Sequence, residues 1–130
     1  IATFTLPAVI GLAVTQSFMG MVSAFLWGSL VRILMLHHVT WSINSICHFY
    51  GREAYKARDE SKNVWALSPL SFGESWHNNH HAFPWSARLG LGAWQVDFGW
   101  YAIRGLAALG LATDVKVPSI EQIEKRRLPR

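Results

Sequence analysis

The feature that most constrains this chain is a long N-terminal stretch without charge. From Ile1 to Val31 no side chain is ionisable, and Arg32 is the only Lys, Arg, Asp or Glu before Tyr50. Charged residues make up 15% of the 130 residues, against about 25% in an average soluble domain. A helix needs about 20 apolar residues to cross about 30 Å of hydrocarbon. The stretch therefore predicts a membrane segment and argues against a soluble monomer.

This stretch is too long for one span and too short for two, and it divides at a polar break, Thr15-Gln16-Ser17. We expect residues 1–17 to form a truncated transmembrane helix and residues 18–49 to form a transmembrane helix that extends into the cytosol. The chain begins with Ile inside an apolar run and has no charged n-region, so this is not a signal peptide. We expect the C-terminal part of a longer, multi-pass membrane protein; the alternative is a complete small protein with a buried helical hairpin.

Residues 50–130 carry nearly all the charge, and we expect them to form a cytosolic histidine-box region followed by C-terminal helices. The positive-inside rule places them, and with them any site that they carry, on the cytoplasmic side. A helix is expected over 92–113, where Asp97 and Arg104 argue against a span. The tail 121–130 is expected to be a solvated helix end that can contact anionic lipid, and no nucleic-acid binding is expected. The cytoplasmic placement of residues 50–130 rests on four basic residues that follow the second expected helix: Arg52, Lys56, Arg58 and Lys62. Each of them is expected to be solvated beside anionic lipid.

Three of the six histidines form one compact cluster. In a helix His77, His80 and His81 stand at i, i+3 and i+4, so their imidazoles share one face, and Pro84 requires the helix to end. Neutral imidazoles suit zinc, copper, iron and nickel, so the cluster predicts a metal site. The alternative is three histidines with ordinary surface or core partners. The single cysteine, Cys47, excludes a disulfide framework and Cys-rich metal modules.

His48 is a fourth candidate ligand, at the end of the second expected helix. Asn44 lies one helical turn earlier on the same face, and Trp41 lies one turn before Asn44. Polar side chains at the end of a membrane helix are costly unless they face a partner, and we expect that partner to be the same metal centre. His37 lies about 16 Å from His48 along a straight helix, so for His37 and His38 we favour structural roles.

Two motifs, in this order and spacing, resemble those of one enzyme family. Thr40–Gly51 is similar to the T-W-x-x-N-S-x-x-H-x-x-G segment of the membrane acyl-CoA (stearoyl-type, delta-9) fatty acid desaturases. His77–Pro84 is similar to their third histidine box, H-N-x-H-H-x-F-P. The resemblance is to the C-terminal portion of the family and extends to Asp114. The segment Asp59–Trp65 resembles bacterial members in particular.

The resemblance implies an all-α fold in which membrane helices carry a cytosolic helical di-metal cap. It implies that Asn44 reaches iron through a water molecule and that Thr40 and Trp41 line the acyl tunnel. Four residues match family iron ligands: His48, His77, His80 and His81. Three polar neighbours are candidates to orient the imidazoles, with helix capping or loop solvation as an equal alternative: Glu74, Asn78 and Asn79.

The implied reaction is insertion of a cis double bond, at the delta-9 position, into a saturated acyl chain. It uses two irons, O2 and two electrons, because no side chain can oxidise an unactivated methylene. The resemblance implies a fatty acyl thioester, acyl-CoA above all, or an acyl lipid as substrate, and a ferredoxin or cytochrome b5-type reductase chain as electron donor. The family's first two histidine boxes have no match here, so we expect the isolated fragment to be inactive.

Other functions remain compatible with the sequence. A histidine-box hydroxylase or alkane oxidase carries similar histidine clusters. A membrane electron-transfer protein would hold haem between His48 and one of the clustered histidines, which leaves the other histidines unused. A non-catalytic paralogue would only bind or regulate.

Overall fold

The computed structural model describes residues 1–129, and every regular element in this range is helical. The only β-type pairings among the described residues are isolated bridges, such as that between Arg52 and Asn63. The predicted all-α class is therefore confirmed. The chain forms two compact units, 1–41 and 42 onward, and each is described by itself.

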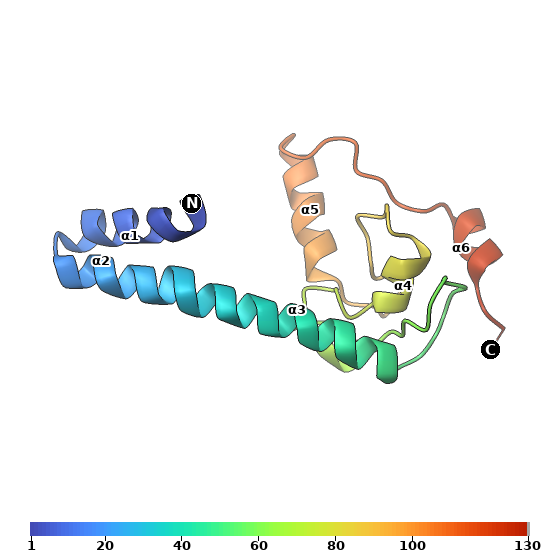
Figure 1. Ribbon diagram of the computed structural model, residues 1–130. Coiled ribbons are helices and arrows are strands. Elements are labelled where there is room, and N and C mark those ends of the chain that lie inside the picture. The colour runs from blue at the N-terminus through green and yellow to red at the C-terminus, as the bar shows by residue number, and fades with distance from the viewer. Residues whose placement is uncertain (130) are drawn as a thin grey trace. The chain divides into compact units, whose positions relative to one another are not determined.

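The first unit is built on a helical hairpin of α1 (Ala2–Thr15) and α2 (Phe18–Phe25), whose helices run side by side in Figure 1. The polar break forms the turn between them. Gln16 adopts the left-handed conformation, with φ of 51°, and the Ser17 side chain caps α2 by accepting a hydrogen bond from the Gly20 N–H at 3.0 Å. The helices touch at Gly11, where an added Cβ would collide with the Ala24 Cβ and the Gly20 carbonyl oxygen.

A single apolar helix runs from Phe18 to Phe49 (Figure 1), made of α2, the π-helical turn η1 (Leu26–Val31) and α3 (Arg32–Phe49). Its 32 residues, with a mean hydropathy of 1.7 in the most apolar window, are long and apolar enough to cross a membrane. At about 1.5 Å per residue the helix is about 48 Å long, which exceeds the hydrocarbon thickness. The 14-residue α1 is shorter than a span.

The second unit contains short elements joined by long loops. They are the end of α3, the 3-10 turn η2 (Trp65–Leu67), α4 (His77–Ala82), α5 (Phe98–Ala108) and α6 (Ile120–Arg126). Its apolar core is small: Tyr55, Ala82 and Phe83 are buried together, with Ala54, Leu91 and Ile123 packed against them. The core therefore lies at the C-terminal end of α4, the histidine helix.

The helix expected over 92–113 is shorter at both ends. It begins at Phe98 because the Asp97 carboxylate is its N-cap and accepts a hydrogen bond from the Trp100 N–H at 2.8 Å. It ends at Ala108, and Gly110 follows with a positive φ of 72°, which is typical of a helix C-terminus. Asp97 thus marks a helix start as well as arguing against a span.

Candidate metal centre

Three histidines from two helices converge in the second unit. His48 lies in the last turn of α3, and His77 and His81 lie one turn apart on α4. One ring nitrogen from each lies within 4.8 Å of the others. The ring centroids of His77 and His81 are 4.4 Å apart, and that of His48 lies 5.2 Å from His77 and 5.5 Å from His81. Nitrogens bound to one ion at about 2.0–2.1 Å lie at most about 4.2 Å apart, so these three can share one ion after at most a small adjustment of the rings.

His77 is the most constrained member of the cluster. Its side chain is buried, and neither ring nitrogen forms a hydrogen bond with the part of the chain that the structure describes. Burial, and then the neighbouring imidazoles of His81, His48 and His80, lower the pKa of His77 from 6.5 to about 4, against a smaller opposing effect of the Glu74 backbone. The ring is therefore neutral near pH 7 and has a free lone pair. Buried nitrogens without partners are costly, and a metal ion satisfies one of them, so the residues fit a metal site.

His80 lies beside this group rather than in it. Its ring centroid is 6.2 Å from that of His77 and 5.5 Å from that of His81, but it is not part of the three-nitrogen cluster. It lines a neighbouring cavity of about 230 Å³ together with Phe72, Glu74 and Trp100. The structure thus brings together three of the four predicted ligands at one point and places the fourth next to them.

An aspartate that the sequence analysis did not assign to the site holds one of the rings. The Asp59 carboxylate accepts a hydrogen bond from Nδ1 of His81 and another from the Ser61 N–H at 3.1 Å. Partial burial acts to raise the pKa of Asp59, but the hydrogen bonds from Ser61 and His81 outweigh it and lower this pKa to about 2. With Nδ1–H donated to the carboxylate, Nε2 of His81 carries the lone pair that binds metal.

Comparison with known proteins identifies the family. No family model matches the chain. Over 119 residues it is 50% identical to the chloroplastic palmitoyl-monogalactosyldiacylglycerol delta-7 desaturase of Arabidopsis thaliana. The matched region covers 92% of this chain and 32% of that protein. It is 52% identical over 113 residues to delta-9 acyl-lipid desaturase 1 of the same plant, covering 87% of this chain and 37% of that protein. The chain belongs to the acyl-lipid and acyl-CoA desaturase family.

A third relative extends the match to the acyl-CoA enzymes. Acyl-CoA 5-desaturase AL21 of Anemone leveillei is 51% identical over 102 residues, which cover 78% of this chain and 31% of that protein. The predicted resemblance to desaturases is confirmed. All three relatives are named desaturases, which are oxidoreductases. The three are plant proteins, so the resemblance to bacterial members finds no support in them. The chain spans about a third of the length of the curated relatives it matches.

Lys62 secures the end of the helix that carries His48. Its ammonium donates hydrogen bonds to the carbonyl oxygens of His48 at 3.3 Å and Phe49 at 3.2 Å, and its backbone N–H donates to the Cys47 carbonyl at 2.6 Å. A cation at these positions also interacts favourably with the helix dipole. Lys62 is therefore not simply a solvated residue beside lipid, as its place in a basic run suggested.

The asparagines of α4 bind loops instead of imidazoles. The Asn78 amide accepts hydrogen bonds from the N–H groups of Ala54 and Tyr55, both at 2.8 Å, and donates to the Tyr55 carbonyl at 3.0 Å. The Asn79 amide donates to the Leu89 carbonyl at 2.7 Å and to the Gln95 side chain at 2.8 Å. Both asparagines are buried and hold loops against α4, which is neither the imidazole contact nor the helix capping or loop solvation that the sequence suggested.

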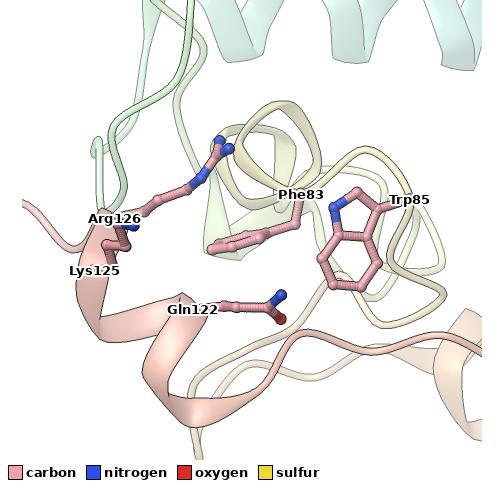
Figure 2. A pocket seen from close by; sticks show the side chains of 5 residues that line it. All are labelled: Phe83, Trp85, Gln122, Lys125 and Arg126. Atoms are coloured by element: carbon pink, nitrogen blue, oxygen red, sulfur yellow. The ribbon is translucent and has the colours of Figure 1, made fainter.

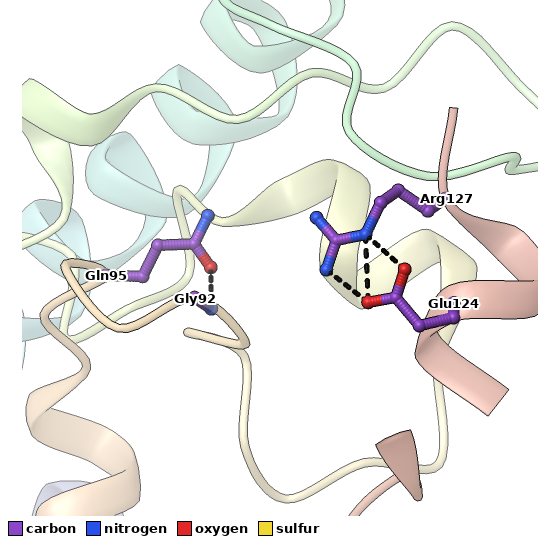
Figure 3. A network of polar contacts seen from close by, with 4 residues as sticks. All are labelled: Gly92, Gln95, Glu124 and Arg127. Atoms are coloured by element: carbon purple, nitrogen blue, oxygen red, sulfur yellow. Dashed lines mark hydrogen bonds and ion pairs between the residues drawn. The ribbon is translucent and has the colours of Figure 1, made fainter. Parts of the chain in front are cut away.

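The Gln95 side chain extends this support to the next loop. Its amide oxygen accepts a hydrogen bond from the backbone N–H of Gly92 at 2.8 Å (Figure 3) as well as from Asn79. A single amide thus ties the turn 92–95 to the histidine helix.

The predicted substrate residues belong to the first unit. The Thr40 hydroxyl donates to the Leu36 carbonyl at 2.9 Å. The exposed Trp41 ring lies against His37 and His38, with centroid distances of 5.5 and 6.0 Å. Asn44 is exposed on α3, one turn before His48. The tunnel roles of Thr40 and Trp41 and the water-mediated role of Asn44 stay predictions.

Proposed function

We propose that this chain is part of a membrane di-iron fatty acyl desaturase that inserts a cis double bond, at the delta-9 position, into a saturated acyl chain. The observation that carries the proposal is the buried His77, whose unpartnered nitrogens lie against His48 and His81. It occurs in a chain that is about half identical to named desaturases.

In this proposal His48, His77 and His81 bind one iron. His80 contributes to the second iron, Asn44 reaches the metal through a water molecule, and histidines outside this chain complete the centre. Bound iron supplies the oxidising power, from O2 and two electrons, that removal of hydrogen from a methylene requires. The chain's own residues prepare the site: Asp59 fixes the tautomer of His81, burial keeps His77 neutral, and Lys62 holds the His48 turn.

The substrate and partners follow from the relatives and the sequence. The relatives' names include acyl-lipid, acyl-CoA and palmitoyl-galactolipid desaturases, so we propose a fatty acyl thioester or an acyl lipid as substrate. Its acyl chain would pass Thr40 and Trp41. Two electrons would come from a ferredoxin or cytochrome b5-type donor. The protein would be a multi-pass membrane protein with the site on the cytoplasmic side, its lipid contacts made by the apolar helices.

Iron content and product analysis of the intact protein test this function. We expect His77→Ala to lose at least half of the bound iron and all olefin product, because the most buried ligand is removed. His38→Ala, which changes a histidine outside the cluster, should keep both. Unchanged iron in His77→Ala would contradict the proposal. Hydroxylated product would indicate a hydroxylase instead, and a Soret band in the purified protein would indicate haem.

A further inference from the structure

The C-terminal segment 119–128 contacts the histidine helix through Arg126. The guanidinium donates a hydrogen bond to the carbonyl oxygen of Ala82, the last residue of α4, at 2.6 Å. It also lies over the Phe83 ring, 5.4 Å from the ring centroid. Figure 2 shows Arg126 extending from α6 toward Phe83, in a cavity of about 320 Å³ that Trp85, Gln122 and Lys125 also line. The contact joins residues 44 positions apart in the sequence.

The backbone around Arg126 reaches the same helix by a second route. The carbonyl of Arg126 accepts a hydrogen bond from the Lys56 N–H at 2.7 Å, and the Leu128 N–H donates to the Ala54 carbonyl at 3.0 Å. The segment 54–56 is in turn bound to α4, because the N–H groups of Ala54 and Tyr55 donate to the Asn78 side chain. Segment 54–56 therefore lies between the C-terminal segment and the histidine helix and is hydrogen-bonded to both.

The following arginine, Arg127, also holds the segment in place. Arg127 forms a forked ion pair with Glu124, with its closest approach at 2.8 Å (Figure 3), and lies 5.6 Å from the Tyr55 ring centroid. Consecutive arginines thus contact two aromatic rings of the same small core, Phe83 and Tyr55. Two neighbouring cation–π contacts on one core favour a single docked position of this segment.

The histidine helix needs such support because it is very short. α4 has six residues, and isolated helices of this length are unstable in water. The last carbonyls of a helix have no partner within it, and Ala82 is fully buried, so without Arg126 its carbonyl would lose a charged donor. Ala82 directly follows His81, so a displacement of this helix end moves the ring of His81.

We propose that Arg126 is a positioning residue for the metal centre, and that the C-terminal segment is a latch that holds the histidine helix in its metal-binding position. The metal-related part of this inference rests on the proposed function. The latch itself is a statement about α4 and applies with or without metal. A region that the sequence suggested to be a solvated helix end is thereby assigned to the site.

Hydrogen exchange in the intact, metal-free protein tests the latch directly. Arg126→Met keeps much of the side-chain volume but removes the donor and the charge, and we expect amide exchange in α4 to become at least tenfold faster. Exchange in α5 should stay unchanged, whereas a general loss of stability would accelerate both helices. Lys125→Met is the matched control, because the Lys125 side chain lines the same cavity but forms no hydrogen bond or ion pair with any residue in the range 1–129. Wild-type exchange in α4 of Arg126→Met overturns the proposal.

Iron content separates this inference from the proposed function. In the iron-loaded protein we expect Arg126→Met to retain less than half of the wild-type iron and Lys125→Met to retain all of it. If the wild-type protein binds no iron, the proposed function fails, and the exchange experiment still decides the latch. If Arg126→Met does not fold, Arg126→Lys decides, because an ammonium cannot reproduce the planar contact with Phe83. We then expect two- to fivefold faster exchange in α4, and wild-type exchange in Arg126→Lys overturns the latch.

Discussion

His77 combines the two properties that a metal ligand needs before the metal arrives: it is buried, and it is neutral at physiological pH. Burial removes water as an alternative partner, and the neighbouring imidazoles oppose protonation. The same environment makes His77 unfavourable when protonated. A buried, neutral histidine of this kind makes the stability of the metal-free protein fall when the pH is lowered.

This sensitivity gives a prediction for protein from which iron has been removed by a chelator. The pKa of His77 is about 4 in the folded chain and about 6.5 when unfolded, so between these pH values the unfolded state binds more protons. Stability should therefore fall as the pH is lowered from 6.5 to 4, by up to about 3 kcal/mol in total, and this contribution should level off below pH 4. Unfolding followed at several pH values measures it. His77→Gln should flatten this part of the profile, and an equal slope in both proteins would contradict the assignment.

The hydrogen bond between Asp59 and His81 gives a second prediction at the residue scale. Asp59→Asn keeps the shape of the side chain but removes the charge that fixes the His81 tautomer. Partners of this kind typically change metal affinity by about 10- to 100-fold, so we expect iron affinity to fall at least about tenfold. Asp114→Asn is the control, because Asp114 pairs at 3.2 Å with Lys116 on the surface. Equal affinities for the two variants would show that Asp59 does not orient the ring.

The shared face of the clustered histidines could be predicted from the sequence, whereas the residues that hold them in place could not. An i, i+3, i+4 pattern in a helix places imidazoles on one face through local geometry alone. The contact between Asp59 and His81 spans 22 positions and depends on how the loop folds back. The nearest local signal is the turn in which Asp59 accepts from Ser61, and it identifies a turn without naming the imidazole. The contact of Arg126 with Ala82 joins residues 44 positions apart, so no local sequence pattern could predict it.

At the scale of elements, helix bounds could be predicted where strong turn or cap residues mark them, and not where only the apolar pattern was used. Apolar patterning alone predicted one helix over 92–113, but Asp97 and Gly110 delimit a shorter one. The polar break at Thr15–Ser17 was accurate because its residues are strong turn and cap formers. Asn78 and Asn79 could not be assigned in advance, because an amide beside an imidazole and an amide bound to a loop look identical in sequence.

The hairpin of α1 and α2 allows a matched test of close packing between helices. In Gly11→Ala the new Cβ would meet the Ala24 Cβ and the Gly20 carbonyl, so we expect the thermal midpoint of the intact protein in detergent to fall by several degrees. Gly105→Ala makes the same change in α5, where nothing lies within 4 Å of the added Cβ. Alanine is the better helix former by about 1 kcal/mol, so the midpoint should rise or stay unchanged. A tolerated Gly11→Ala would mean that the two helices do not touch at this position.

At the scale of the whole molecule, the chain corresponds to one part of longer relatives. It spans about a third of its relatives, and its second unit surrounds three clustered histidines with a small apolar core and many buried polar groups. Three imidazoles can hold one ion, but the chemistry that we propose uses two irons. In the proposed function, His80, which lies beside the cluster and lines its own cavity, serves the second ion together with ligands from outside the chain.

The proposed need for a second iron leads to the last prediction, that residues 1–130 expressed alone make no olefin. A purified fragment supplied with iron, reductant, O2 and acyl substrate should bind at most one iron per chain, through His48, His77 and His81, and should give no unsaturated product by gas chromatography. The intact protein under the same conditions is the positive control. His48→Ala in the fragment should abolish its residual iron binding, because it removes the ligand that α3 contributes to the two on α4. Turnover by the fragment would mean that His80 and the three clustered histidines form a competent centre without further ligands.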